Sequence, residues 1–537
     1  MNPAMSTTMS PAPSPRRSAW AHPAAPLLLA VALASGCGGG GSSAPAPTPA
    51  PAPTPAPTPA PTPAPSPAPS PAPTPAPSPA PAPAPTPGAA FNGSVLLGAP
   101  TASTVTLKLL SADQTGSLVV AYAPQAGGAE LQSAAVAVKA GEVASLTLGN
   151  LQGDTAYRYR LLFTATGAGS ATASPDYALH TARAAGASFS FTLQADSHLD
   201  ENSSLALYQR TLDNVLADRA DFHIDLGDTF MTEKHSDPLA ALVQMAPDAA
   251  TVNRRYAYER VNFGRFSHSV PLFLVNGNHD GELGWLDTRT AQALPAWATQ
   301  ARQTYFANPQ PGFFYRGDTQ PDPITGTRAA WYSWQWGDAL FVVLDPYWNS
   351  TAQASKDGWN LTLGERQYRW LADTLATSTA AYKFVFLHNL VGGLDGQMRG
   401  GVEAAPFFEW GGKNFDGSDG FAAHRPGWAA PIHTLLVQNK VTAVFHGHDH
   451  LYARQQLDGI VYQEVPQPSA ANTSSGASLA QAYHYTSGTI ASSSGHLRVT
   501  VSPAGVTSEY VRAWLPKDET ATRKNAQVDD RWTVPRP

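Results

Sequence analysis

The chain has 537 residues and a formal net charge of −6, with one cysteine and 49 prolines. The acidic balance and the absence of a Lys/Arg run argue against a nucleic-acid-binding protein, because phosphate backbones are bound by clustered positive charge. A single cysteine excludes an intrachain disulfide and a zinc site of paired cysteines, so any metal must be bound by other side chains.

Residues 1–37 have the pattern of a secretory signal. Arg16 and Arg17 precede an apolar run, residues 26–34, that is too short to cross a bilayer. The run leads into Cys37, and its end resembles the lipobox of bacterial lipoproteins. We therefore expect an exported lipoprotein, periplasmic or at the cell surface, anchored in the outer membrane only through Cys37. A plain signal peptide with a chance cysteine is the alternative.

Residues 38–90 are expected to be a disordered Pro/Ala-rich linker. Proline occupies every second position from Pro45 to Pro87, and the residues between them are Ala, Thr and Ser. Such a chain lacks half of its amide donors and has no apolar residues large enough for a core, so it forms neither helix nor sheet.

Residues 91–184 are expected to form a small all-β sandwich. Short runs such as residues 104–110 and 116–122 have the pattern of strands and are separated by glycine-rich turns. Tyr157, ahead of a long predicted strand, resembles the tyrosine corner of fibronectin type III domains. We expect this domain to position the rest of the chain, because it carries no group of catalytic residues.

From residue 185 to 515, apolar strand-like runs alternate with helical stretches, which is typical of an α/β domain. In such domains functional side chains follow the carboxyl ends of strands. The five predicted strands concerned are residues 189–193, 222–226, 270–275, 383–387 and 441–445. The polar residues that follow them are Asp196, His198, Asp228, Asn278, His279, Asp280, His388, His448 and His450.

The order of these motifs resembles the calcineurin-like metallophosphoesterase superfamily. The resemblance implies a β-sandwich flanked by helices, in an α/β/β/α arrangement. It also implies two divalent transition metal ions of open identity, Mn, Fe, Zn or Co, which imidazole and carboxylate groups suit. One ion would be bound by Asp196, His198, Asp228 and His450. The other would be bound by Asp228, Asn278, His388 and His448, so that Asp228 bridges the two.

The same resemblance implies hydrolysis of small phosphate esters. Two ions about 3.5 to 4 Å apart lower the pKa of a bridging water, and the hydroxide attacks phosphorus. His279 would protonate the leaving oxygen or stabilise the transition state, and Asp280 would orient its ring. We expect a phosphomonoesterase. A phosphodiesterase of the same mechanism is one alternative, and a surface binding or adhesion protein with structural metals is another, from a different class.

The layout, with a sandwich ahead of the catalytic domain, is also that of purple acid phosphatases. This chain differs from that group at His198, where the group has glycine, and at Met231, where the group has a tyrosine ligand.

Residues 516–537 are expected to be a polar tail. Specificity is expected in residues 281–382 and 391–428. The candidate substrate contacts are Trp285, Tyr347, Trp348, Arg399, Trp410, His424 and Tyr452.

Overall fold

The structure is a computed structural model that describes residues 90–234, 247–352 and 357–537. The expected signal segment, Cys37 and all but the last residue of the expected linker lie outside these ranges. None of the helices in the described ranges is long and apolar enough to cross a membrane.

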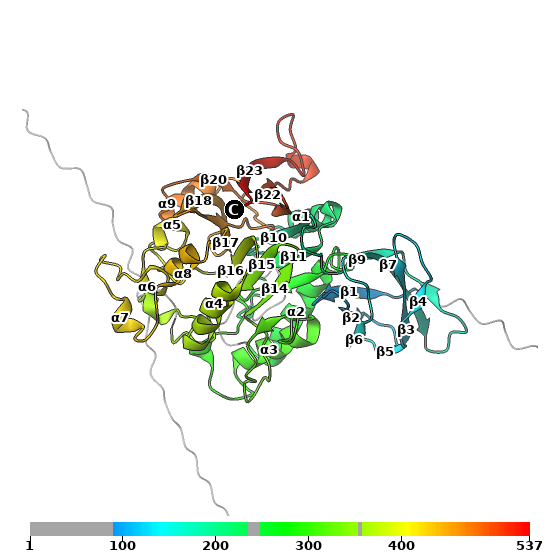
Figure 1. Ribbon diagram of the computed structural model, residues 1–537. Helices are drawn as coiled ribbons and strands as arrows, with labels where there is room; N and C mark the ends of the chain where they lie inside the picture. Colours follow the sequence, from blue (N-terminus) through cyan, green and yellow to red (C-terminus); the bar gives the residue numbers. More distant parts are fainter. Residues whose placement is uncertain (1–89, 235–246, 353–356) are drawn as a thin grey trace, which may run out of the picture. The chain divides into compact units, whose positions relative to one another are not determined.

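Two large sheets form the body of the chain (Figure 1). In spatial order, the first contains β23 (Val528–Pro535), β22 (Gly505–Val511), β21 (His496–Ser502), β10 (Phe189–Gln194), β11 (Phe222–Asp225), β12 (Leu272–Leu274), β1 (Gly93–Gly98), β2 (Val105–Ser111) and β6 (Val143–Leu148). The second contains β13 (Arg316–Gly317), β14 (Tyr332–Trp336), β15 (Ala339–Val343), β16 (Tyr382–Phe386), β17 (Ala443–His446), β19 (Ile460–Glu464), β18 (Leu451–Leu457) and β20 (Thr489–Ser492). Strands β10, β11 and β12 are parallel, as are β15, β16 and β17, so their carboxyl ends share one edge of each sheet.

Aromatic side chains fill the space between the two sheets. Phe191 and Phe222 of the first sheet pack against Phe341 and Phe386 of the second, and all four are fully buried. The ring of Phe191 lies edge-on to that of Phe341, with centroids 5.1 Å apart. Every second residue of β10, starting at Phe189, joins this core, as a strand with period two requires. Each buried ring contributes about 1.5–3 kcal/mol to stability.

Helices cover the outer face of each sheet. The long helices are α1 (Leu205–Asp218), α2 (Ala249–Phe263), α3 (Leu294–Tyr305) and α4 (Glu365–Thr377). The shorter ones are α5 (Gly401–Ala404), α6 (Phe408–Gly411), α7 (Phe421–His424), α8 (Ile432–Gln438) and α9 (Gly476–Ala482), with 3₁₀ turns η1 (Gly284–Leu286), η2 (Gly358–Asn360) and η3 (Pro516–Asp518). Helices α1 to α3 share a core with the first sheet, and α4 and α8 share one with the second. The predicted α/β/β/α arrangement is confirmed.

A third, smaller sheet completes a sandwich near the beginning of the described chain. It contains β4 (Leu131–Gln132), β3 (Gly116–Pro124), β7 (Ala156–Ala165) and β8 (Thr172–Ala173), with β5 (Val136–Val138) beside β3 and β9 (Tyr177–His180) beside β7. It shares a core with β1, β2 and β6. Tyr157 is buried at the start of β7, and its hydroxyl accepts a hydrogen bond of 2.8 Å from the Gln152 amide. This is the arrangement expected of a tyrosine corner.

The small sandwich and the α/β body share a sheet. Strand β1 pairs in parallel with β12, Gly98 opposite Leu272. Arg260 of α2 crosses the same junction and donates hydrogen bonds to the Ser94 hydroxyl at 3.0 Å and to the Lys108 carbonyl at 2.5 Å. The expected boundary between residues 184 and 185 therefore lies within one continuous set of packed strands.

The end of the chain differs from the expected polar tail. Residues 528–535 form β23, which pairs with β22 at the edge of the nine-stranded sheet. Trp532 of this strand is buried, and its indole N–H donates to the Gln463 side-chain oxygen at 2.9 Å. The alternation of Trp532 and Val534 with charged and polar neighbours supplies the apolar face. This alternating pattern covers too few residues to predict a strand from the sequence.

Candidate metal centre

All seven expected metal ligands lie at one edge of the two sheets. They follow β10, β11 and β12 in the first sheet and β16 and β17 in the second. The carboxyl ends of these parallel strands meet there, which explains why residues more than 250 positions apart come together: the amide of His448 donates to the Asp196 Oδ2 atom at 2.9 Å.

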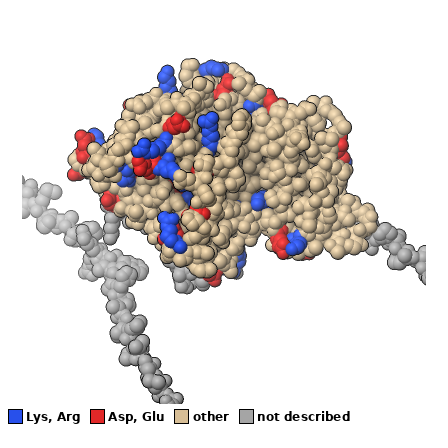
Figure 2. All heavy atoms as spheres, turned by 60° about the horizontal axis from the view of Figure 1, so that its bottom comes forward, with Lys and Arg blue, Asp and Glu red and all other residues tan. Residues whose placement is uncertain are grey.

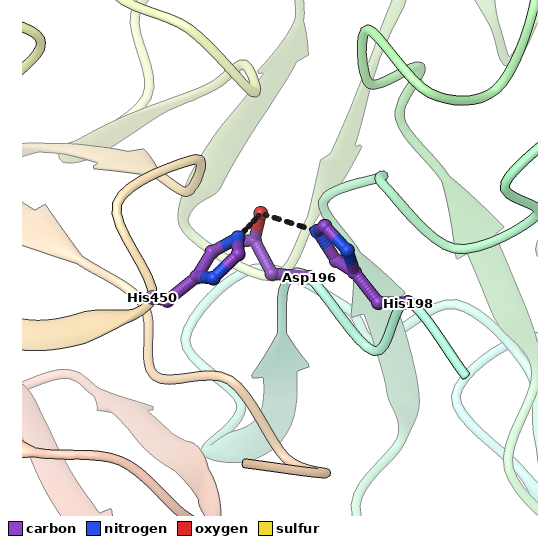
Figure 3. A group of neighbouring side chains, drawn as sticks. All are labelled: Asp196, His198 and His450. Carbon is purple, nitrogen blue, oxygen red and sulfur yellow. Dashed lines mark ion pairs between the residues drawn. The ribbon is translucent and has the colours of Figure 1, made fainter. Parts of the chain in front are cut away.

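The first group of ligands is Asp196, His198 and His450, each offering one atom within 4.8 Å of the others. Figure 3 shows both imidazole rings directed at the Asp196 carboxylate. The Asp196 Oδ1 atom lies 3.4 Å from Nε2 of His450 and 3.8 Å from Nε2 of His198. Asp196 is fully buried, whereas a third of the His450 side chain is exposed, so this group lies near the surface.

The second group is Asp228, His388 and His448, and all three are buried. The Nδ1 atom of His388 is hydrogen-bonded to the Leu226 carbonyl, which leaves Nε2 directed at Asp228 Oδ2, 3.1 Å away. The Nε2 atom of His448 faces Asp395 at 3.2 Å, which leaves its Nδ1 atom free for a ligand role. Partners of this kind fix the orientation of metal-binding histidines.

Asp228 lies between the two groups. Its Oδ1 atom accepts a hydrogen bond of 2.7 Å from the His279 amide. Its Oδ2 atom lies 3.1 Å from Nε2 of His388 and 3.7 Å from Nε2 of His198, one member of each group. This is the position that a bridging carboxylate requires.

Unpaired buried atoms show that these residues fit metal ions. The atoms without a hydrogen-bond partner among the described residues include Asp196 Oδ1, His198 Nε2, Asn278 Oδ1, His388 Nε2 and His448 Nδ1. Leaving such an atom unpaired costs about 1–3 kcal/mol, and five together point to a bound group that satisfies them. Imidazole and carboxylate donors suit Mn, Fe, Zn or Co.

The backbone around the ligands is strained. Five of the seven expected ligands have positive φ angles, namely Asp196 (61°), His198 (54°), Asp228 (54°), His448 (86°) and His450 (58°). Non-glycine residues in this region cost of order 1 kcal/mol each and concentrate at functional sites. Close backbone approach adds to this, because a Cβ at Gly277 would lie 2.2 Å from the Asp228 amide nitrogen.

His279 lies beside the metal ligands, and its partner is not the expected one. Its Nε2 atom is 4.0 Å from Asp228 Oδ2, and its Nδ1 atom contacts the buried carboxylate of Glu233. Burial lowers the pKa of His279, but the carboxylates of Asp228 and Glu233 outweigh it and raise the pKa above its ordinary value. Glu233 was missed from the sequence because it follows Asp228 by five residues in an irregular loop.

Asp280 has a different role from the expected one. Its carboxylate accepts hydrogen bonds from the backbone amides of Gly277 (2.7 Å), Asp228 (3.1 Å), Thr229 (2.9 Å) and Phe230 (2.9 Å). Asp280 therefore holds the two ligand loops together and does not orient the His279 ring. Four backbone N–H groups donate to the Asp280 carboxylate, and none of its hydrogen bonds goes to the His279 ring.

A pocket of about 280 Å³ opens beside the second group. It is lined by Asn278, His279, Trp285, Tyr347, Leu361, Asn389, Asp395, Arg399 and His448. Three of the expected substrate contacts, Trp285, Tyr347 and Arg399, are among these residues.

The other four expected contacts lie elsewhere. Trp410 is fully buried and donates to the Tyr462 hydroxyl at 2.8 Å. Tyr452 is also buried and donates to Asp530 at 2.6 Å. The remaining two stack on other side chains: Trp348 under Arg328, with 3.7 Å between guanidinium carbon and ring centroid, and His424 on Trp359, with ring centroids 4.3 Å apart.

Residues 189–452 match the model of the calcineurin-like phosphoesterase family. This range contains all seven expected ligands together with His279 and Glu233. Residues 189–452 therefore form a domain of the metallophosphoesterase superfamily, as the motifs predicted, and this superfamily is a class of metal-dependent phosphoesterases.

Solved structures share the fold. One, described as the structure of PhoD, is similar with a TM-score of 0.58 and 16% identity, over 84% of this chain and 92% of the other. Another, purple acid phosphatase PPD1 from yellow lupin (Lupinus luteus) seeds, has a TM-score of 0.52 and 15% identity, over 82% and 74%. At these identities the similarity establishes the fold alone. A comparison with curated protein sequences gives no match.

Proposed function

We propose that this chain is an exported dimetal phosphatase that hydrolyses small phosphate monoesters. The observation that carries the proposal is the pair of ligand groups on either side of Asp228, whose unpaired buried atoms face one another beside a pocket. Two divalent ions bound there would act as Lewis acids and lower the pKa of a coordinated water.

The protein's own residues supply the remaining steps. His279 lines the pocket and protonates the leaving oxygen, while Glu233 holds the ring by its Nδ1 atom. Asp280 keeps the loops of Asn278 and Asp228 in register through their backbone amides. The pocket volume of about 280 Å³ lies at the low end for ligand sites, which favours a small ester.

The expected absence of a nucleic-acid substrate is part of the proposal. On the face in Figure 2, positive and negative residues are interspersed and most of the surface is uncharged. A formal net charge of −6 gives no long-range attraction for a polyanion.

Substrate class is tested by comparing p-nitrophenyl phosphate with bis(p-nitrophenyl) phosphate on metal-loaded protein. We expect the monoester to have the higher kcat/KM, and chelation to abolish turnover of both until a divalent metal is restored. A higher kcat/KM for the diester would make the chain a phosphodiesterase. No turnover of either by metal-loaded protein would favour a binding protein with structural metals.

Export and anchoring are tested separately through Cys37. The basic pair Arg16 and Arg17, the apolar run and the cysteine support them. We expect the wild-type chain in the membrane fraction and Cys37→Ala outside it. Equal distribution of the two would contradict the lipid anchor.

A further inference from the structure

Arg399 is the only Lys or Arg among the described residues that line the pocket of the metal centre. It lies in the loop between β16 and α5, and its side chain is 18% exposed. In the same pocket lie the expected ligands Asn278 and His448 and the proposed acid His279. A guanidinium at this place faces the volume that a substrate beside the second ligand group occupies.

The Arg399 side chain is held in place by contacts with Asp449, His448 and Tyr483. Its Nε atom lies 3.0 Å from Asp449 Oδ1, and its Nη2 atom donates to the His448 carbonyl at 2.8 Å. The guanidinium carbon lies 4.3 Å from the centroid of the Tyr483 ring. Its Nη1 atom makes no hydrogen bond to a described side chain or backbone group, so donors are left for a ligand.

Asp449 is itself fixed in a buried network. Its Oδ2 atom accepts a hydrogen bond of 2.6 Å from the Tyr485 hydroxyl, and its amide donates to Glu464 at 3.0 Å. Packing is tight, because a Cβ at Gly400 would lie 2.5 Å from both Asp449 Oδ2 and the Tyr485 hydroxyl oxygen. Asp449 stands between the expected ligands His448 and His450 in the sequence, and its Oδ1 atom faces Arg399.

We propose that Arg399 binds a non-bridging oxygen of the substrate's phosphate group, and that Asp449 is the positioning residue that holds it there. This inference rests on the proposed function and deepens it. Guanidinium donors match phosphate oxygens in geometry, and an arginine held from behind loses little side-chain entropy when it binds. Asp449 and Asp395 offset the charge of Arg399, so its contribution comes from directed hydrogen bonds.

The test uses the full metal-loaded chain and two probes, p-nitrophenyl phosphate as substrate and inorganic phosphate as product. Arg399→Ala is expected to raise the inhibition constant of inorganic phosphate and to lower kcat/KM, each by about ten- to a hundredfold, with the metal content unchanged. Direct calorimetric binding of inorganic phosphate to the same protein gives a readout without turnover.

Asp449→Asn tests the positioning role through a double-mutant cycle. Alone, it is expected to weaken phosphate binding by about three- to tenfold. In the Arg399→Ala background it is expected to have no further effect, because the residue that it positions is gone. Tyr485→Phe is expected to act in the same direction as Asp449→Asn with a smaller change.

The control is the exposed pair Arg265 and Asp213, whose closest atoms are 2.8 Å apart and lie outside the pocket. Arg265→Ala and Asp213→Asn should leave phosphate binding unchanged. An unchanged phosphate affinity in Arg399→Ala, or additive effects of Arg399→Ala and Asp449→Asn, would overturn the inference. Loss of metal from Arg399→Ala would also overturn it. Absence of ester turnover in the wild type would instead count against the proposed function, and calorimetry would still decide the role of Arg399.

Discussion

The Nδ1 atom of His279 contacts the carboxylate of Glu233, and both residues lie against the bridging Asp228 loop. This contact fixes the imidazole so that its other nitrogen faces the pocket and the centre. It makes Glu233, and not Asp280, the residue that orients the proposed acid.

Glu233→Gln is therefore expected to slow reactions that need protonation of the leaving group. The rate for an alkyl ester such as glycerol 2-phosphate should fall about ten- to a hundredfold. The rate for p-nitrophenyl phosphate should fall less than about threefold, because p-nitrophenolate leaves without a proton. Glu201→Gln, which changes an exposed neighbour paired with Lys234, is the matched control. Equal losses on both substrates would contradict the orienting role.

His279→Ala is expected to lower kcat on the alkyl ester by about 10²- to 10⁴-fold, the usual contribution of a general acid. The metal content should be retained, because the His279 side chain is outside both ligand groups. Metal analysis of the purified variant checks this. Loss of metal from the variant would mean that His279 is a ligand.

Glu282 forms a buried ion cluster with Arg302 and Arg328, and its loss should destabilise the fold. Its two oxygens lie 2.5 Å from Arg302 and 2.5 Å from Arg328. Removing one partner of such a cluster leaves buried charge unpaired, so Glu282→Gln should lower the free energy of unfolding at pH 7 by about 3–5 kcal/mol. Urea unfolding of the wild type and the variant measures this. A loss under 1 kcal/mol would contradict it.

The same cluster predicts a pH dependence of stability. Burial raises the pKa of Glu282, but Arg302 and Arg328 outweigh it and lower the pKa to about 2. Its unfolded pKa is about 4.3, so the carboxylate contributes stability that is fully present above that pH and is lost as the pH falls toward 2. The contribution is on the order of 3 kcal/mol. The stability gap between wild type and Glu282→Gln should therefore narrow between pH 5 and about pH 3. A gap that stays constant over this range would be inconsistent with the shift.

The small sandwich is expected to unfold together with the α/β body. Strand β1 is paired with both β2 and β12, and Arg260 is hydrogen-bonded to Ser94 and Lys108. Calorimetry should show one transition for the wild type. Arg260→Ala should lower the unfolding free energy by about 2–4 kcal/mol, because it leaves buried carbonyls unpaired. Two separate transitions in the wild type would show that the sandwich folds alone.

The ligand set was visible in the sequence because each ligand directly follows an apolar run. Parallel strands bring their carboxyl ends to one edge, so Asp196, Asp228 and His388 could be grouped without knowing any distance. Helix α4 is encoded in a similarly local way, because its buried residues Gln367, Tyr368, Leu371, Thr374 and Leu375 recur at helical spacing.

Other features depend on contacts that no local pattern encodes. Glu233 reaches His279 from an irregular loop, and Asp449 reaches Arg399 across 50 positions of the chain. Trp410 stands in a glycine-rich stretch that resembles a binding loop, yet it is fully buried. Side-chain direction in loops is set by tertiary packing. The contacts of Glu233 with His279 and of Asp449 with Arg399 could therefore not be predicted from the sequence.

The dimetal centre is tested most directly by metal analysis together with phosphatase rate for the wild type and Asp228→Asn. The carboxylate oxygen of Asp228 lies between both ligand groups, so replacing it should affect both ions at once. We expect about two metal ions per wild-type chain, and in Asp228→Asn a loss of metal with at least about a hundredfold loss of rate. An active wild type with no bound metal, or an Asp228→Asn variant with full activity, would contradict it.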